Sequence, residues 1–455
     1  MQKLHELGGT ALYNALCWAF FIFLKGRKTM IDINLIREHK EEVTRALAKK
    51  GWTENFEVLL SKDALRRTLR QEVENAKAEQ NRLSASVPAV KKAGGDINEL
   101  FAKVKQIKAD NEAKEAELNV IDGEINKVLL ELPNLPDEDL LAGGKENNKV
   151  VYTFKDKPVF NFAIKDHVEL CESLQLIDYK RGAKISGSGT WIYKGLGAML
   201  EWALLNFFVS EHLKDGYEMI IPPHILNYES GVTAGQFPKF EEDVFWLEGM
   251  SPRRFLLPTA ETALVNFHRD EILSEEELPH KYFAYTPCYR SEAGSYRTEE
   301  RGMIRGYQFN KVEIVQYTKE DESDVAFEEM VNKAKTLVEK LGLHFQISKL
   351  AAGDCSHSMA RTYDVEVWIP SMGIYKEVSS ASNARDYQAR RGMMRYRDKE
   401  TGKTKYLHTL NASGLATSRL IPAIVEQFQT RDGSVIIPEV LRPFMGGVEK
   451  ISLPK

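Results

Sequence analysis

Between Leu65 and Leu132, apolar residues recur at alternating steps of three and four, and the positions between them are rich in Glu, Lys, Arg and Ala. A repeat of about 3.5 residues is typical of helices that wind around one another in a coiled coil. The segment from Ala93 to Asp96 contains two glycines and interrupts the repeat, which then resumes. The pattern therefore predicts two long helices that fold back on one another as an antiparallel arm.

The apolar seam of this arm also predicts its register. Folding the two helices about the glycine turn pairs Leu83 with Ile107 and places Gln80 opposite Asn111. Polar residues that meet in a coiled-coil seam fix the register at some cost in stability. We therefore expect a hydrogen bond between Gln80 and Asn111.

A second pattern lies between Tyr289 and Glu313. Both ends of this stretch are rich in aromatic and β-branched residues, whereas its centre, Ser295 to Gly302, is polar and dense in charge. This arrangement predicts two antiparallel strands joined by a charged loop. We expect the strands to hold cations and carboxylates rigidly around one surface, as a phosphate-binding site requires: Arg290, Arg305, Glu292 and Glu313.

The apolar segments after the arm predict a larger mixed domain. A broad helical stripe runs from Ala198 to Leu213, and a strand from Tyr217 to Ile221 ends at Pro222. The stripe is broad enough to bury a contact between subunits. Because 455 residues exceed one ordinary core, we expect an extension (1–29), the arm domain (30–135), a linker (136–150) and the larger domain (151–455).

Composition restricts the function classes only slightly. The hydrophobic fraction of 43% is typical of globular proteins, and the net charge of -4 neither supports nor excludes nucleic-acid binding. The four cysteines, Cys17, Cys171, Cys288 and Cys355, include no C-x-x-C pair. This spacing argues against a structural zinc site and a disulfide framework. It fits a reducing compartment, in which each cysteine is a small core residue.

The first 29 residues contain an apolar run from Ala11 to Leu24. At about 14 residues the run is shorter than the ~20 that cross a bilayer as a helix. Its cations follow the run, unlike those of a signal peptide. We interpret the segment as an extension upstream of a natural start at Met30 and expect no stable membrane association. A membrane-surface anchor is the alternative.

The outer face of the predicted arm carries many cations. Mixed charge is expected on any solvated coiled-coil face, so periodicity alone favours a structural interpretation. Between Arg82 and Asp96, however, cations occur without an acidic residue to offset them, which favours contact with a phosphate backbone. The candidate contacts are Arg70, Lys77, Arg82, Lys91, Lys92 and Lys103.

Three separated blocks resemble, in order, motifs 1, 2 and 3 of class II aminoacyl-tRNA synthetases. They are the helix, strand and Pro222 described above, the stretch from Tyr289 to Glu313, and the segment from His408 to Arg419, which we expect to open another helix. The arm in front, together with Thr259–Glu261, Glu377–Ser380 and Ser382–Arg391, narrows the resemblance to seryl-tRNA synthetases. The resemblance runs from Met30 nearly to the C-terminus.

The resemblance implies an α+β fold, in which the antiparallel two-helix coiled-coil arm precedes a class II catalytic domain built on a mixed, mainly antiparallel sheet flanked by helices. It implies that L-serine and ATP form seryl-adenylate and pyrophosphate, and that serine then moves to the 3′ end of tRNA(Ser), and of tRNA(Sec) where that tRNA is present. It further implies Mg²⁺, a cytoplasmic homodimer, and binding of the tRNA by the arm of the dimer partner.

The resemblance also assigns roles in ATP binding. Arg290 would bridge the serine carboxylate and the α-phosphate, two anions that repel, and Arg419 would hold the γ-phosphate; these are the expected catalytic residues. Phe309 would stack on adenine, while Glu377 and Ser380 would bind Mg²⁺, which prefers oxygen ligands. The expected ATP set is completed by Ser291, Glu292, Arg305, Val378 and Ser379.

Serine recognition is assigned in the same way. The expected pocket consists of Thr259, Ala260, Glu261, Arg290, Glu313 and Ser413. An ammonium group calls for a carboxylate, and a small hydroxyl calls for fixed hydrogen-bond partners, which this set provides. Such a pocket can reject alanine by about 10⁴ because its own polar groups would be left unpaired.

The chain departs from the family pattern at three places. Ala412 stands where glycine is usual, Tyr307 replaces a usual histidine, and the loop from Arg297 to Arg301 differs from the common sequence. These departures put the loop's contact with the tRNA acceptor end in doubt more than the adenylate chemistry.

Two other functions stay open at this point. A synthetase-like ligase could activate an amino acid for a carrier protein, although such a protein has no need of the complete arm. A catalytically silent RNA-binding or scaffold protein is also compatible with the fold. The intact Arg290, Glu292, Glu377 and Arg419 weigh against that alternative.

Overall fold

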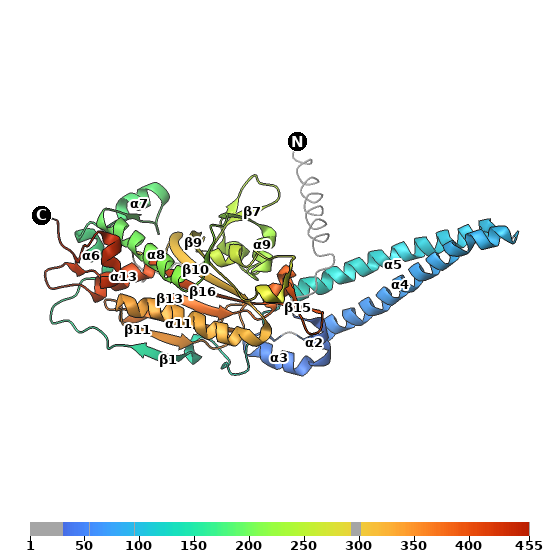
Figure 1. Ribbon diagram of the computed structural model, residues 1–455, viewed down its shortest axis with the longest axis horizontal. Helices are drawn as coiled ribbons and strands as arrows, with labels where there is room; N and C mark the ends of the chain where they lie inside the picture. Colours follow the sequence, from blue (N-terminus) through green and yellow to red (C-terminus); the bar gives the residue numbers. More distant parts are fainter. Residues whose placement is uncertain (1–30, 54, 95, 293–301, 455) are drawn as a thin grey trace. The chain divides into compact units, whose positions relative to one another are not determined.

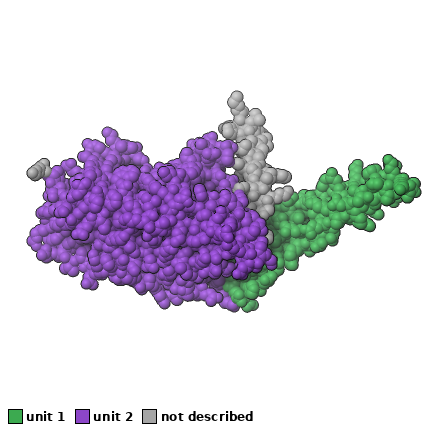
Figure 2. Space-filling model, in the orientation of Figure 1, with its two compact units in different colours: residues 1–44, 53–132 green, residues 45–52, 133–455 purple. Residues whose placement is uncertain are grey.

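The structure is a computed structural model that describes residues 31–53, 55–94, 96–292 and 302–454. The expected extension, Cys17 and the loop from Arg297 to Arg301 lie outside the described residues. The chain divides into two compact units, residues 1–44 with 53–132 and residues 45–52 with 133–455 (Figure 2). The larger unit thus includes a short segment that precedes the arm in the sequence.

Two long antiparallel helices form the arm of the smaller unit (Figure 1). Helix α4 spans Glu57–Lys92 and α5 spans Ile97–Glu131; the shorter α2 (Ile33–Glu38) and α3 (Lys40–Ala48) precede them. The seam residues Leu69, Val73 and Ile121 are buried. Ion pairs join the two helices in the predicted register, including Lys77 with Glu115 at 2.7 Å and Lys114 with Glu72 at 2.7 Å.

The predicted hydrogen bond between Gln80 and Asn111 is wrong. Asn111 is only 5% exposed, and its Nδ2 donates to Glu115 Oε1 at 3.1 Å, one turn further along its own helix. Its Oδ1 accepts no hydrogen bond from any residue that the structure describes. The side-chain amide of Asn111 therefore donates to Glu115 on its own helix and not to Gln80 across the seam.

A sheet of eight described strands organises the larger unit (Figure 1). Its order is β1-β11-β12-β13-β16-β10-β9-β4, and every neighbouring pair is antiparallel except β4 and β9. The strands span β1 Lys149–Phe154, β4 Glu218–Met219, β9 His280–Tyr289, β10 Gln308–Thr318, β11 Phe345–Lys349, β12 Arg361–Ile369, β13 Ile374–Asn383 and β16 His408–Ala416. The expected mixed, mainly antiparallel sheet is confirmed.

Helices α8 (Leu196–Lys214), α11 (Ser323–Leu341) and α13 (Thr417–Gln427) pack against this sheet. Shorter helices are α6 His167–Ser173, α7 Tyr179–Ser186, α9 Tyr228–Thr233, α10 Ala260–Leu264 and α12 Tyr387–Gly392, with 3₁₀ turns at Lys145–Asn147, Glu241–Asp243, Glu275–Glu277, Glu320–Glu322 and Glu439–Met445. Small sheets are formed by β2 Ile177–Asp178 with β3 Ile192–Tyr193, by β5 Ile225–Asn227, β6 Trp246–Leu247 and β7 Arg254–Leu256, by β8 Ile272–Ser274, β14 Arg395–Arg397 and β15 Thr404–Tyr406, and by β17 Val435–Ile436 with β18 Lys450–Ile451.

The pleat of β10 separates the core from the candidate site. Successive side chains of a strand point to opposite faces. Val312 and Ile314 join the main hydrophobic core, together with Leu204 and Phe208 of α8. Residues of the opposite parity, such as Glu313, face away from that core. The strand is thereby held rigidly on one face while it presents polar groups on the other.

The structure corrects two boundaries that were expected from the sequence. The strands β9 and β10 do pair, but the ladder ends at Tyr289 and Gln308, so Arg290, Glu292 and Arg305 lie beyond the strand ends. Glu292 adopts a positive φ of 52°, which is not a strand conformation. In addition, residues His408–Ala416 form strand β16, and helix α13 begins only at Thr417.

The cysteine prediction is confirmed for Cys171, Cys288 and Cys355, which are free and buried. Among the helices that the structure describes, none combines the length and apolar character that a bilayer crossing requires. The first strand of the larger unit, β1, begins at Lys149.

Candidate active site

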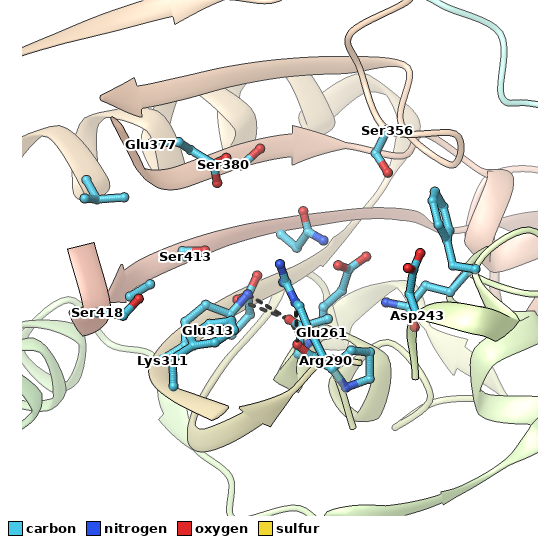
Figure 3. A pocket seen from close by; sticks show the side chains of 18 of the residues that line it. Asp243, Glu261, Arg290, Lys311, Glu313, Ser356, Glu377, Ser380, Ser413 and Ser418 are labelled. Atoms are coloured by element: carbon cyan, nitrogen blue, oxygen red, sulfur yellow. Dashed lines mark hydrogen bonds and ion pairs between the residues drawn. The ribbon is translucent and has the colours of Figure 1, made fainter. Parts of the chain in front are cut away.

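A pocket of about 430 Å³ opens on the polar side of strands β10, β13 and β16 (Figure 3). It brings together most of the residues that the sequence selected, although they come from segments far apart in the chain. The predicted residues that line it are Thr259, Glu261, Arg290, Glu292, Arg305, Phe309, Glu313, Glu377, Val378, Ser380, Ser413 and Arg419. The pocket is therefore the candidate active site.

Three of the selected residues do not line this pocket. Ala260 is fully buried, and Ser379 is buried with its Oγ donating to Ser413 O at 2.6 Å. Ser291 donates from its Oγ to Glu242 O at 2.6 Å. Ser379 thus supports the strand that carries Ser413, and its side chain is already used within the protein.

Arg290 follows directly after β9 and lies over the Phe309 ring, with 5.1 Å between the guanidinium carbon and the ring centroid. Its backbone N–H donates to Tyr307 O at 3.0 Å, which extends the ladder by one bond. Its Nε donates to Pro258 O at 3.3 Å. The aromatic face and the carbonyl fix the guanidinium while leaving other N–H groups directed into the pocket.

A second arginine comes from the first turn of α13. Arg419 donates from Nη1 to Glu377 O at 2.8 Å and from Nε to Ile304 O at 3.2 Å, and Nη1 lies 3.7 Å from Glu377 Oε2. Helix α13 thus fixes this cation beside β13. A third cation, Arg305, forms an ion pair with Glu292 between β9 and β10.

Glu313 lies in the floor of the pocket and is only 2% exposed. It pairs in register with Ser413 of the neighbouring strand β16. It also forms an ion pair with Lys311, whose Nζ donates to Thr259 Oγ1 at 2.8 Å. Thr259 caps helix α10. Glu313, Lys311 and Thr259 therefore form one connected polar group, and Ser413 lies beside it on the neighbouring strand.

Glu261 is the second carboxyl group of this floor. Gln388 Nε2 donates to its Oε1 at 2.8 Å, and Gln388 also donates to Ala234 O at 3.0 Å. Burial, together with the charge of the nearby Glu313, raises the pKa of Glu261 to about 7. This carboxyl group therefore holds a proton more tightly than an exposed glutamate does.

Glu377 and Ser380 face the floor from β13 on the opposite side of the pocket (Figure 3). Mg²⁺ in nucleotide sites is commonly held by one or two protein oxygens together with phosphate oxygens. The hydroxyl and carboxylate oxygens present here fit that donor set. The described residues contain no cluster of three or more His, Cys, Asp or Glu side chains that could hold a metal by itself.

Sequence reasoning missed several pocket residues. Lys311, Asn411, Gln236 and Ser356 line the pocket, and Gln388 supports it from behind. Lys311 could have been found, because it alternates with Phe309 and Glu313 along one face of a predicted strand. The others carry no local signal, since their positions depend on contacts between distant segments.

The cations selected on the arm differ in their surroundings. Arg70 lies 3.6 Å from Asp122, Lys77 lies 2.7 Å from Glu115, and Arg82 lies 2.7 Å from Glu79. Lys103 is exposed. Lys91 and Lys92 near the tip are exposed as well, and like Lys103 they form no ion pair with any described residue. Among the selected cations, Lys91, Lys92 and Lys103 are therefore the ones available to an outside partner.

Comparisons with known proteins agree with this geometry. Residues 30–136 match the family model of the seryl-tRNA synthetase N-terminal domain, and residues 245–428 match that of the class II tRNA synthetase core domain (G, H, P, S and T). The chain is 61% identical to serine–tRNA ligase 2 of Clostridium acetobutylicum over 92% of this chain and 99% of that protein. It is 43% identical to serine–tRNA ligase of Syntrophotalea carbinolica over 93% and 100% of the two chains.

Two solved structures resemble the whole fold. One is seryl-tRNA synthetase from Pyrococcus horikoshii complexed with ATP, with a TM-score of 0.87, 32% identity, and coverage of 93% of this chain and 100% of that one. The other is cytoplasmic serine–tRNA ligase from Naegleria fowleri in complex with AMP, with a TM-score of 0.83, 25% identity, and coverage of 93% and 99%.

Proposed function

The chain belongs to the seryl-tRNA synthetase family and is a class II ligase that activates serine with ATP and charges tRNA; from this premise we propose that the pocket between β10, β13 and β16 performs the activation. One observation carries the proposal. Arg290 and Arg419, which are far apart in the sequence, line the same pocket as the buried Glu313.

We propose that Arg290 brings the two reactants together. The reaction joins a serine carboxylate oxygen to the α-phosphorus of ATP and expels pyrophosphate. Because carboxylate and phosphate repel, a fixed cation between them lowers the energy of the transition state, in which both anions lie closest. Arg290 is suited to this role, since Phe309 and Pro258 O fix it before the substrates arrive.

The remaining ATP contacts follow from the same geometry. Phe309 supports the adenine ring, while Arg305 and Glu292 lie beside the nucleotide as a pair. Arg419 holds the γ-phosphate end, where pyrophosphate leaves. Glu377 and Ser380 would hold Mg²⁺, which offsets triphosphate charge when bound.

Serine would bind over the floor of the pocket. Glu261 would accept the substrate ammonium, and Glu313 with Ser413 would recognise the hydroxyl, because these two face one another on neighbouring strands. Thr259 and Lys311 hold Glu313 in place, the first through a hydrogen bond and the second through an ion pair. A hydroxyl site built from buried polar groups disfavours alanine, which would leave those groups unpaired.

The activation pocket is tested by serine-dependent ATP–pyrophosphate exchange, measured across the amino acids. We expect exchange with serine and a loss of at least about 10³-fold in the variant Glu313→Ala, because the buried polar partners of Glu313 lose their acceptor. Glu320→Ala, an exposed glutamate beyond the same strand, is the matched control and should exchange normally. Near-normal exchange by Glu313→Ala would refute the assignment.

We also propose that the arm binds tRNA(Ser) by shape and phosphate contacts, and tRNA(Sec) where it occurs. The exposed Lys91 and Lys92 near its tip support this proposal. Neither a carrier-protein ligase nor a silent scaffold is needed to explain an arm of this length together with a complete pocket. We also propose a cytoplasmic location, because the enzyme must meet its tRNA substrate there and because the free cysteines fit a reducing compartment.

A homodimer is proposed from the exposed apolar side chains of α8 and the segment after it. Trp202 is 56% exposed and Ile221 is 82% exposed. Exposed apolar residues gathered on one element often mark a subunit interface. The other exposed apolar residues of α8 and the segment after it are Met199, Leu213 and Met219. In such a dimer, one protomer's arm would present tRNA to the partner's pocket.

A further inference from the structure

Five consecutive backbone carbonyls beside the pocket, those of residues 356–360, accept hydrogen bonds from two short segments that lie far away in the sequence. Lys50 Nζ donates to Ser356 O at 3.0 Å and to Met359 O at 2.7 Å. Asn134 donates from its backbone N–H to His357 O at 2.9 Å and from Nδ2 to Ser358 O at 2.9 Å. The backbone N–H of Asp137 donates to Ala360 O at 3.0 Å.

The two donor segments flank the arm in the sequence. Lys50 lies just before the arm and Asn134 just after it, and both segments belong to the larger unit. Asn134 is 6% exposed, and its Nδ2 also donates to Ala384 O at 2.8 Å. Residues separated by about eighty positions therefore hold one loop from the same side.

Lys50 is an unusual donor. Its ammonium group contacts carbonyl oxygens, and no carboxylate of a described residue lies within ion-pair distance. Burial, with a smaller contribution from the nearby Lys239, lowers the pKa of Lys50 to about 8. Lys50 therefore acts as a donor to the backbone of this loop and not as a member of an ion pair.

The loop that these residues hold forms one wall of the pocket. Ser356, Ser358 and Met359 all line it, and Ser356 points into the open space (Figure 3). Ser358 packs closely against Gly235, where the Cβ of any larger residue would lie 2.7 Å from the Ser358 Cβ. Gly235 follows Ala234, whose carbonyl accepts from the same Gln388 that donates to Glu261. The wall therefore adjoins the proposed serine side of the pocket.

We infer that Lys50 and Asn134 are positioning residues for serine recognition: by binding the carbonyls of residues 356–359, they fix the wall formed by Ser356, Ser358 and Met359. Neither residue touches the proposed substrate positions directly. Each acts through the backbone, so the loss of either lets the wall move without removing any group that contacts serine. This inference rests on the proposed assignment of the pocket to serine activation.

The variant Lys50→Met tests this inference in the full-length protein, because it keeps the length of the side chain but removes the donor. We expect the KM for serine in ATP–pyrophosphate exchange to rise about tenfold, with kcat and the KM for ATP changed by less than about twofold. Lys50→Arg can donate to both carbonyls and should restore most of the affinity.

Lys49→Met is the matched control. Lys49 Nζ also donates to two carbonyls, Glu138 O at 2.7 Å and Leu140 O at 3.2 Å, but neither belongs to the pocket wall. It should leave the KM for serine unchanged. Thermal unfolding of each variant separates loss of stability from loss of positioning. If Lys50→Met does not fold, Asn134→Ala carries the same expectation.

An unchanged KM for serine in Lys50→Met, or an equal rise in Lys49→Met, overturns the inference. A lower melting temperature with normal KM also overturns it, since that result assigns Lys50 a purely structural role. The assignment of the pocket to serine activation is tested separately. If the wild-type protein exchanges with serine and Glu313→Ala does not, the pocket assignment holds whatever Lys50→Met shows.

Discussion

Serine affinity should depend on the protonation of Glu261. Burial and the nearby Glu313 raise the pKa of Glu261 to about 7. A raised pKa means that the neutral acid predominates below pH 7 and the carboxylate above it. Only the carboxylate attracts the serine ammonium, which is charged throughout this range. Serine binding is therefore expected to weaken as the pH falls through 7.

The size of the effect follows from the pKa. At pH 8 about one tenth of Glu261 carries a proton, whereas at pH 6 about nine tenths does, so the apparent Kd for serine should rise about tenfold. The groups that face Glu261 are Glu313, Lys311, Gln388 and Asn411. Of these, Glu313 opposes ionisation of Glu261 and Lys311 favours it.

Calorimetric titration with serine at pH 6, 7 and 8 measures this dependence. Omitting ATP keeps the protonation of the triphosphate out of the result. The variant Glu261→Gln should bind weakly at pH 8 and show little change down to pH 6, because it has no titrating group. Equal affinity of the wild-type protein at pH 6 and pH 8 would show that Glu261 does not hold the ammonium.

Three further predictions concern other parts of the molecule. The double variant Lys91→Ala, Lys92→Ala should raise the KM for tRNA about tenfold and make that KM less dependent on salt, without affecting pyrophosphate exchange. The control variant Lys77→Ala should raise the KM for tRNA less, because Lys77 is already paired with Glu115. An equal rise in both variants contradicts the choice of contacts. Trp202→Arg should shift the protein from dimer to monomer in sedimentation, and a wild-type monomer would exclude this interface. Asn111→Leu should increase the free energy of unfolding in urea by about 1 kcal/mol, because it removes a buried oxygen without a described partner; a decrease would contradict this.

The arm and the main sheet were predictable because their signals are local. The 3.5-residue repeat alone predicted both helices of the arm, and Leu69 and Ile121 are buried in its seam as expected. The aromatic and β-branched residues at both ends of the stretch from Tyr289 to Glu313 likewise predicted the paired strands β9 and β10. What a local pattern cannot give is the point at which pairing stops, so Arg290 was placed on a strand that ends one residue earlier.

The membership of the pocket was only partly predictable. Motif order selected Arg290, Glu313 and Arg419, which the structure brings together. Gln388 and Lys50 were missed, because each acts on groups more than a hundred residues away. Nothing in the sequence next to Lys50 indicates that its amine will meet Met359 O. Such contacts are determined by the packing of the whole unit rather than by a repeat or a motif.

The two carboxyl groups of the pocket floor should differ in what they recognise. Glu261 can titrate near neutral pH, whereas Glu313 is paired with Lys311 and lies opposite Ser413. If Glu261 holds the ammonium, every small amino acid that binds must share its pH dependence, alanine included. If Glu313 and Ser413 hold the hydroxyl, the ratio of serine to alanine affinity should stay constant from pH 6 to pH 8. Competition of alanine against serine at each pH measures this ratio. If the ratio of serine to alanine affinity decreases as the pH is lowered from 8 to 6, Glu261 contributes to hydroxyl recognition. Recognition of the ammonium and of the hydroxyl would then not be separate.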